Sequence, residues 1–232
     1  MERDGNGDGD GTRDAERRDG RDTRWNDHRA ERRDRVLDAA LAAIAREGSG
    51  VSVAAIGKEA GMPRSVVYRV FRSREDLDEQ IRARIMDDLM SELAPTLDPK
   101  GTVREAVRLV AATYVGWVVE HPRLHQFLGT GSRVVVGTRT AVARQLAGLL
   151  DEFAVRLLAG AQAPTGYSLD LAFGMVGLVD GVVNRWVAHP ESRSTPEDLT
   201  AFLSDALWGV LSGAARQLGV ELDPDLPIDD LR

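Results

Sequence analysis

The sequence predicts an all-α fold of about nine helices, and two patterns support this prediction. Apolar residues recur at spacings of three and four along most of the chain, whereas no segment alternates between apolar and polar residues with a period of two. In addition, three segments begin with a Ser or Thr that is followed three positions later by an acidic residue, which is a signal for the start of a helix. No β-sheet is therefore expected.

The helix boundaries follow from these start signals and from Gly and Pro residues that interrupt the pattern. The start signals lie at Ser73, Thr102 and Thr195, and Gly48 and Gly61 end two earlier helices. The expected helices span about residues 28–47, 53–60, 63–71, 73–93, 102–120, 122–128, 138–161, 168–188 and from 195 onward.

Both ends of the chain are expected to lie outside this helical body. Residues 1–26 are mostly Gly, Asp and Arg, with almost no apolar side chain. Such a segment cannot bury enough surface to offset the entropy that it would lose on ordering. We therefore predict a disordered tail over residues 1–26 and a short C-terminal tail over residues 221–232.

Several classes of protein are disfavoured by what the sequence lacks. It has no cysteine, which excludes disulfides, thiolate metal sites and cysteine nucleophiles. It has no Gly-x-Ser-x-Gly elbow, phosphate-binding loop or His-Glu-x-x-His motif, so neither an enzyme nor a bound cofactor is expected. No apolar run reaches the roughly 18 residues of a membrane span, and no signal peptide is evident. We expect a cytoplasmic protein without membrane contact.

Charge is distributed unevenly along the chain, whose formal net charge is -7. Residues 1–28 have a net charge of -3 and residues 86–232 a net charge of -7. Residues 29–85, by contrast, hold 12 basic and 9 acidic side chains, a net charge of +3. A basic module joined to an acidic body is expected when one part of a protein meets phosphate and the other part does not.

The basic module has the layout of a helix-turn-helix. Residues 52–71 contain two short expected helices separated by Gly61, a residue that permits a sharp turn. Ser52 is placed to cap the first helix. Ile56 and Ala60 face its packing side, where the small Ala60 allows close approach of the second helix.

The second helix of the pair has two different faces. Val67 and Phe71 are four residues apart and are expected to point into the core, where Leu37, Leu41 and Ile44 also lie. The opposite face is short, polar and basic, and it suits the major groove of DNA because it combines donors for guanine and phosphate with an apolar contact for thymine. The alternative is an ordinary two-helix corner with a polar surface. The residues proposed for this face are Arg64, Ser65, Val66, Tyr68 and Arg69.

A set of residues between positions 35 and 77 identifies the family that this module resembles. The set comprises Arg35 to Ala40, Gly48, Ser52, Ile56, Ala60, Gly61, Tyr68, Phe71, Ser73, Arg74, Glu75 and Leu77. In these residues the chain resembles the N-terminal domain of tetracycline-repressor (TetR) family transcription factors. The resemblance implies a helix-turn-helix DNA-binding domain of three helices over residues 27–78 and a larger helical domain over residues 79–220 that binds an effector and dimerises.

The resemblance also implies which residues contact operator DNA. They are Ser52 at the preceding helix, the recognition-helix residues Arg64, Ser65, Val66, Tyr68 and Arg69, and Arg74 as the basic residue that binds phosphate at the start of the fourth helix. The family usually has Lys at this last position. In addition, Pro63 stands where a capping Ser is common in the family.

Two helices of the larger domain carry small residues at helical spacing. Small residues allow two backbones to approach closely, so we predict that these positions form the interface of a homodimer. The alternative is close packing of the two helices within one chain. The residues are Gly174, Gly177 and Gly181 on one helix, and Ala206, Gly209 and Gly213 on the other.

Most aromatic residues of the larger domain fall between positions 110 and 190, and we predict that a group of them encloses an effector cavity near Trp117. Such a wall favours a flat or hydrophobic molecule with one polar group. The alternative is that these side chains form solid core. The predicted lining comprises Tyr114, Trp117, His121, Phe127, Phe173 and Trp186.

His121 and His125 are four residues apart and suggest a metal site. However, Pro122 lies between them and no third ligand is apparent, so no metal site is expected.

Together these features predict a sequence-specific DNA-binding transcriptional regulator. We favour a ligand-responsive repressor that acts as a homodimer on a palindromic operator in double-stranded DNA, with a small hydrophobic or aromatic effector. The alternative is a helical DNA-binding regulator without a small-molecule effector, and an enzyme is the less favoured class.

Overall fold

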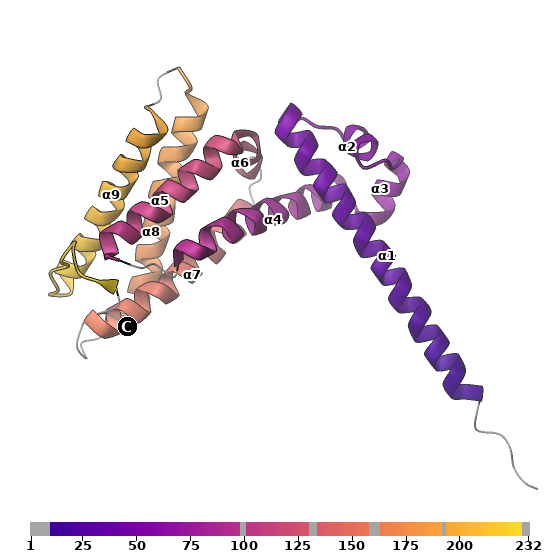
Figure 1. Ribbon diagram of the computed structural model, residues 1–232, viewed down its shortest axis with the longest axis horizontal. Helices are drawn as coiled ribbons and strands as arrows, with labels where there is room; N and C mark the ends of the chain where they lie inside the picture. Colours follow the sequence, from indigo (N-terminus) through magenta and orange to yellow (C-terminus); the bar gives the residue numbers. More distant parts are fainter. Residues whose placement is uncertain (1–9, 98–100, 130–133, 158–162, 192–193, 229–232) are drawn as a thin grey trace, which may run out of the picture.

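A computed structural model describes residues 10–97, 101–129, 134–157, 163–191 and 194–228 (Figure 1). This part of the chain contains nine α-helices, one short 3₁₀ helix and no strand, which confirms the all-α prediction. The elements are α1 (Asp10–Glu47), α2 (Val53–Glu59), α3 (Arg64–Val70), α4 (Arg74–Leu93), η1 (Ala94–Leu97), α5 (Val103–Glu120), α6 (Pro122–Gly129), α7 (Val134–Leu157), α8 (Tyr167–Ala188) and α9 (Pro196–Gln217).

The three predicted start signals all cap helices. The Ser73 hydroxyl accepts from the backbone N–H of Asp76 at the start of α4. Thr102 and Thr195 each form a capping box, in which the Thr hydroxyl and the acidic side chain three residues later each accept a backbone N–H. Local side-chain chemistry therefore places the starts of α4, α5 and α9.

The first helix is longer than expected. It begins at Asp10 instead of near residue 28, so the backbone of residues 10–26 is helical where we expected a disordered tail. The expectation considered only burial. The arginines, Ala15 and Glu16 of this segment are good helix formers and no Pro occurs before Pro63, so no Pro ends the helix beyond its packed part, although the Asp and Gly residues there are poor helix formers. Figure 1 shows the early turns of α1 projecting away from the other helices.

The N-terminal helices share one core with the body of the molecule. The residues that fill the space between α1, α2 and α3 are fully buried, and α4 continues the same apolar cluster toward α5. In Figure 1, α4 runs from the α1–α3 unit to the remaining helices. The buried residues that connect the two parts include Val36, Ile44, Ile56, Val67, Phe71, Leu77, Ile81, Ile85, Val115 and Leu203.

In the body, α5 packs on α9 and α7 packs on α8. Small buried side chains fill the second contact, with Ala143 and Ala147 on α7 and Ala172 on α8. By length and composition α8 is apolar enough to cross a membrane, the one such helix in the described part. A core helix of a globular protein also passes this test, and α8 buries Met175 and Trp186 inside the chain.

The segment after α9, residues 218–228, turns back along the molecule, and we call it the C-terminal strap. The backbone N–H of Val103 donates to the Leu226 carbonyl, and the N–H of Ile228 donates to the Gly101 carbonyl at 2.8 Å. Ile228 is fully buried. The strap is therefore part of the packed body as far as residue 228, which corrects the expectation that residue 221 begins a separate tail. Residues 229–232 lie outside the described part.

Candidate nucleic-acid interface and ligand cavity

The turn between α2 and α3 is held by backbone hydrogen bonds. The Ser52 hydroxyl caps α2 by accepting from the N–H of Ala55 at 3.1 Å. At the other end of α2, the N–H of Met62 donates to the Gly57 carbonyl at 2.7 Å. Gly61 lies between the bonded residues Gly57 and Met62. Its φ of +67° is a conformation that other residues adopt only at a cost. The predicted sharp turn at Gly61 is confirmed.

The closest approach of the two helices occurs at Gly57. A Cβ atom at this position would lie 2.6 Å from the Met62 carbonyl oxygen and 3.4 Å from a methyl carbon of Val67. The sequence pattern predicted the close approach at Ala60, which is buried, whereas the closest contact is at Gly57. The available signal was a glycine inside a short helix, since glycine lowers helix stability unless a close contact requires it.

The exposed face of α3 carries the predicted DNA contacts. Arg64, Ser65 and Arg69 are exposed, and the Arg64 guanidinium lies over the Tyr68 ring at 5.4 Å from its centroid. The opposite face packs as expected, because Val67 and Phe71 are buried. The structure therefore brings two exposed arginines, a hydroxyl and an aromatic ring together on one short helix.

Two other predicted contacts are in different surroundings. Val66 is half-buried, which leaves less of its side chain for a base. Arg74 is also half-buried, and its guanidinium donates to the Val51 carbonyl at 2.7 Å and to the Asp78 carboxylate at 3.0 Å. The bond to Val51 joins the start of α4 to the loop before α2, so Arg74 has a structural role that the sequence did not indicate.

A cavity of about 710 Å³ lies in the body between α4, α5, α7, α8 and α9. Its wall is formed mostly by Leu, Val, Met and Ala side chains, and the strap contributes Leu218, Val220, Leu222 and Ile228. The volume is in the range of small-molecule sites. The strap residues were not among the predicted lining residues, because residues 221–232 were expected to form a tail.

The cavity is not beside Trp117, and of the six predicted lining residues Tyr114 alone is part of its wall. Trp117, Phe127 and Trp186 are almost fully buried core residues, as the alternative reading held. His121 packs against the Trp117 ring, and Phe173 is 40% exposed on the outer side of α8. Helical spacing placed these aromatic residues on helices correctly but did not show on which side of each helix the empty space lies.

One end of the cavity is polar. The Tyr114 hydroxyl and the Nε2 atom of His125, which lies on α6, are hydrogen-bonded at 3.1 Å. Burial lowers the pKa of His125, and the negative charge of Asp180 opposes this shift without cancelling it. Tyr114 and Asp180 both line the cavity, and we call the region around them the polar end.

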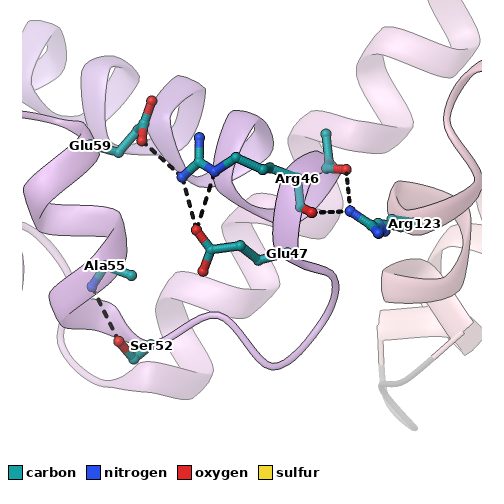
Figure 2. Close-up of polar contacts among 7 residues, drawn as sticks. Arg46, Glu47, Ser52, Ala55, Glu59 and Arg123 are labelled. Atoms are coloured by element: carbon teal, nitrogen blue, oxygen red, sulfur yellow. Dashed lines mark hydrogen bonds and ion pairs between the residues drawn. The ribbon is translucent and has the colours of Figure 1, made fainter.

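Helix α6 also contacts the helix-turn-helix unit. The Arg123 guanidinium donates to the carbonyls of Ala45 and Arg46 in the last turn of α1 (Figure 2). The Arg46 side chain in turn forms an ion pair with Glu59 on α2 at 3.0 Å. Hydrogen bonds thus lead from the cavity wall through α6 to α1 and α2.

Comparison with known proteins identifies the N-terminal unit. Residues 36–81, from α1 to the first turns of α4, match the family described as bacterial regulatory proteins, tetR family. The N-terminal unit of the chain is therefore a tetR-family helix-turn-helix unit. Proteins of this family are transcriptional regulators rather than enzymes.

Curated relatives match the chain over most of its length. An uncharacterized HTH-type transcriptional regulator of Mycobacterium tuberculosis is 28% identical over an alignment of 205 residues that covers 84% of this chain and 83% of the relative. The nucleoid occlusion factor SlmA of Vibrio atlanticus is 25% identical over 79% of this chain and 95% of its own length. The resemblance therefore extends beyond the helix-turn-helix into the body.

Solved structures show the same fold. A tetR-family regulator from Streptomyces coelicolor superposes with a TM-score of 0.63 at 21% identity, covering 87% of this chain and 94% of that one. The fatty acid degradation regulator FadR from Bacillus halodurans gives a TM-score of 0.59 at 18% identity over 78% of this chain and 95% of that one.

The glycines predicted at the tetR-family dimer interface are on the outside of this chain. Gly174, Gly177, Gly181 and Gly209 are exposed, and a Cβ atom added at any of them would meet no atom within 4 Å. This finding contradicts the alternative that they allow α8 and α9 to pack closely within one chain. Gly213 and Ala206 are half-buried.

The structure gives no support to a metal site at the histidine pair. His121 contacts Trp117, whereas His125 bonds to Tyr114, so the two rings face different partners. The described residues contain no group of three or more potential ligands.

Proposed function

We propose that this chain is a repressor that binds a palindromic DNA operator as a homodimer and releases it when a small molecule occupies the cavity. The proposal of DNA binding rests on the exposed face of α3. This face holds Arg64, Tyr68 and Arg69, and it belongs to a unit that matches the tetR family. Arginine donates to guanine O6 and N7 or to phosphate, and the Tyr68 hydroxyl and Ser65 are suited to phosphate. Such a protein acts in the cytoplasm, where its DNA lies.

The homodimer is proposed from an exposed apolar face on α8 and α9. Leu169, Phe173 and Gly177 follow one another on α8 at four-residue spacing. Phe202 and Ala206 have the same spacing on α9. Leu169, Phe173 and Phe202 are 37%, 40% and 57% exposed. Bulky and small apolar residues on one face allow that face to pack on a second copy of itself, as two-fold symmetry requires. A two-fold dimer also matches a palindromic site.

The proposed release mechanism uses α6. An effector that contacts Tyr114 disturbs its hydrogen bond to His125, and the resulting shift of α6 moves Arg123 and the end of α1 to which it is bonded. The effector then favours a conformation in which the two recognition helices no longer fit successive major grooves. The cavity supports this reading over a regulator without a small-molecule effector.

DNA binding is tested by fluorescence anisotropy with DNA from upstream of the protein's own coding sequence. Arg64→Ala and Tyr68→Ala should each weaken specific binding, Arg64→Ala by about 1 to 3 kcal/mol if it reads a base. Arg108→Ala is the matched control, because Arg108 is exposed on α5, far in sequence from α3. Equal affinity of the parent for this DNA and a scrambled duplex at matched salt would contradict the proposal.

A further inference from the structure

The cavity is elongated. Its lining residues on α8 extend from Ser168 to Asp180, and those on α5 extend from Val103 to Tyr114. At a rise of 1.5 Å per residue these stretches are about 17 to 18 Å long. A volume of about 710 Å³ that extends over this length fits an elongated molecule better than a compact one.

The wall of the cavity is mostly aliphatic. Leu and Val are its commonest residues, and Met residues of α4 and α8 are also part of it. The aromatic members among the described lining residues are Tyr114, Phe153 and Tyr167. Flat aromatic ligands gain affinity by stacking on aromatic rings, whereas aliphatic and thioether side chains adapt to the shape of an alkyl chain. The wall therefore suits a flexible alkyl chain.

The wall offers little to a charged ligand. No Lys, Arg or His occurs among the described lining residues, so an anion would be buried without a basic partner. The acidic lining residues are Glu152, which is exposed, and Asp180. Asp180 already has an interaction within the chain, so a cation would compete with an existing partner of this carboxylate. An uncharged molecule avoids the cost of burying a charge.

We propose that the effector is an uncharged molecule with a long, flexible alkyl chain, which occupies the cavity along α5 and α8. This inference deepens the proposed function, since it rests on the cavity being the effector site. It narrows the hydrophobic or aromatic effector expected from the sequence to an aliphatic one, because Trp117, Phe127 and Trp186 are core residues and not part of the wall. A sugar is disfavoured because most of the wall offers no hydrogen bonds.

The first experiment varies the length of the alkyl chain. Hexanol, octanol and decanol are each titrated into the DNA-free full chain in a calorimeter. Moving one methylene group from water into an apolar wall should strengthen binding about fourfold, so each step of two methylenes should give about fifteenfold. A site that accepts only compact molecules would instead gain no affinity as the chain is lengthened.

The second experiment keeps the size of the probe and changes its charge or its shape. Decanoate and decylamine have the same number of carbon atoms as decanol but carry a negative or a positive charge, and they are titrated below micelle-forming concentrations. The third probe, 2-naphthalenemethanol, has the neutral hydroxyl group of decanol on a flat aromatic ring system. We expect decanol to bind at least about tenfold more tightly than each of these three probes.

Two neighbouring residues on α5 provide the matched variants. Val110 lines the cavity, whereas Leu109 is 48% exposed and is not among the lining residues. Val110→Phe fills part of the cavity and should weaken decanol binding by about tenfold, and Leu109→Phe should leave it unchanged. If Val110→Phe does not fold, Val110→Leu, which adds one methylene, should weaken decanol more than hexanol, because the longer chain needs more of the cavity.

The outcomes separate this inference from the proposed function. Affinity that does not rise with chain length, binding of a charged or aromatic probe as tight as that of decanol, no binding of any probe, or decanol binding that Val110→Phe leaves intact would each overturn the inference. Specific operator binding can still be observed in all of these cases, so the DNA-binding proposal survives them. Conversely, selective binding of decanol without release of operator DNA would support the ligand class and refute effector-driven release.

Discussion

Replacement of Gly57 by alanine tests whether the close contact of α2 with α3 controls the DNA-binding unit. The added Cβ would lie 2.6 Å from the Met62 carbonyl oxygen, a backbone atom that no side-chain rotation can move away. The Met62 N–H donates to the Gly57 carbonyl at 2.7 Å, so the two segments cannot separate without stretching this bond. We expect Gly57→Ala to lower the free energy of unfolding.

The magnitude follows from two opposing effects. Overpacking of this severity costs about 2 to 3 kcal/mol, the upper part of the usual range. Alanine is better than glycine inside a helix by about 1 kcal/mol. The net loss is then about 1 to 2 kcal/mol, which corresponds to a fall in the melting temperature of about 2 to 8 °C for a chain of this length.

Gly116→Ala is the matched control. Gly116 lies within α5, is exposed, and a Cβ added there would meet no atom within 4 Å. This variant gains helix propensity without a clash and should be more stable than the parent by about 0.5 to 1 kcal/mol. Urea unfolding of both variants, monitored by circular dichroism, gives the comparison. The argument fails if Gly57→Ala is as stable as Gly116→Ala.

Three other outcomes are expected. Gly177→Leu should convert the dimer to monomers, because the bulky side chain separates the exposed α8 faces of the two copies. Sedimentation equilibrium measures this, and a parent protein that is monomeric at micromolar concentration would contradict the dimer. Arg123→Ala should fold normally but lose part of its response to the effector, measured as the operator affinity without effector divided by that with effector. An unchanged ratio would show that α6 does not transmit the response. Burial lowers the pKa of His125, so as pH falls below about 6.5 the unfolded chain takes up a proton that the folded chain does not, and stability declines. The parent's stability should therefore fall more steeply with acid than that of His125→Gln in unfolding titrations, and equal slopes would show that the buried imidazole is not responsible.

The helices were predictable because their starts depend on local chemistry. The Ser73, Thr102 and Thr195 caps act within a single turn, and Gly61 determines the turn by its own backbone freedom. The early part of α1 was not predicted, because the sequence argument considered burial and left local helix propensity out.

The exposed face of α3 was predictable for a similar reason. Val67 and Phe71 identify the buried side of α3, and the polar side chains on the other side are exposed, whereas Val66 is half-buried. The cavity was not predictable, since its position depends on how five helices from distant parts of the chain meet. Trp117 and Tyr114 are only three residues apart, yet one is core and the other lines the cavity.

The strap has a practical consequence for work with this protein. Ile228 lines the cavity, so a purification tag or fluorescent protein fused a few residues after Ile228 is attached close to the cavity wall. A fusion at the other end of the chain precedes α1, whose early turns project away from the body in Figure 1. The same proximity makes the strap a suitable place for a reporter dye that responds when the cavity fills.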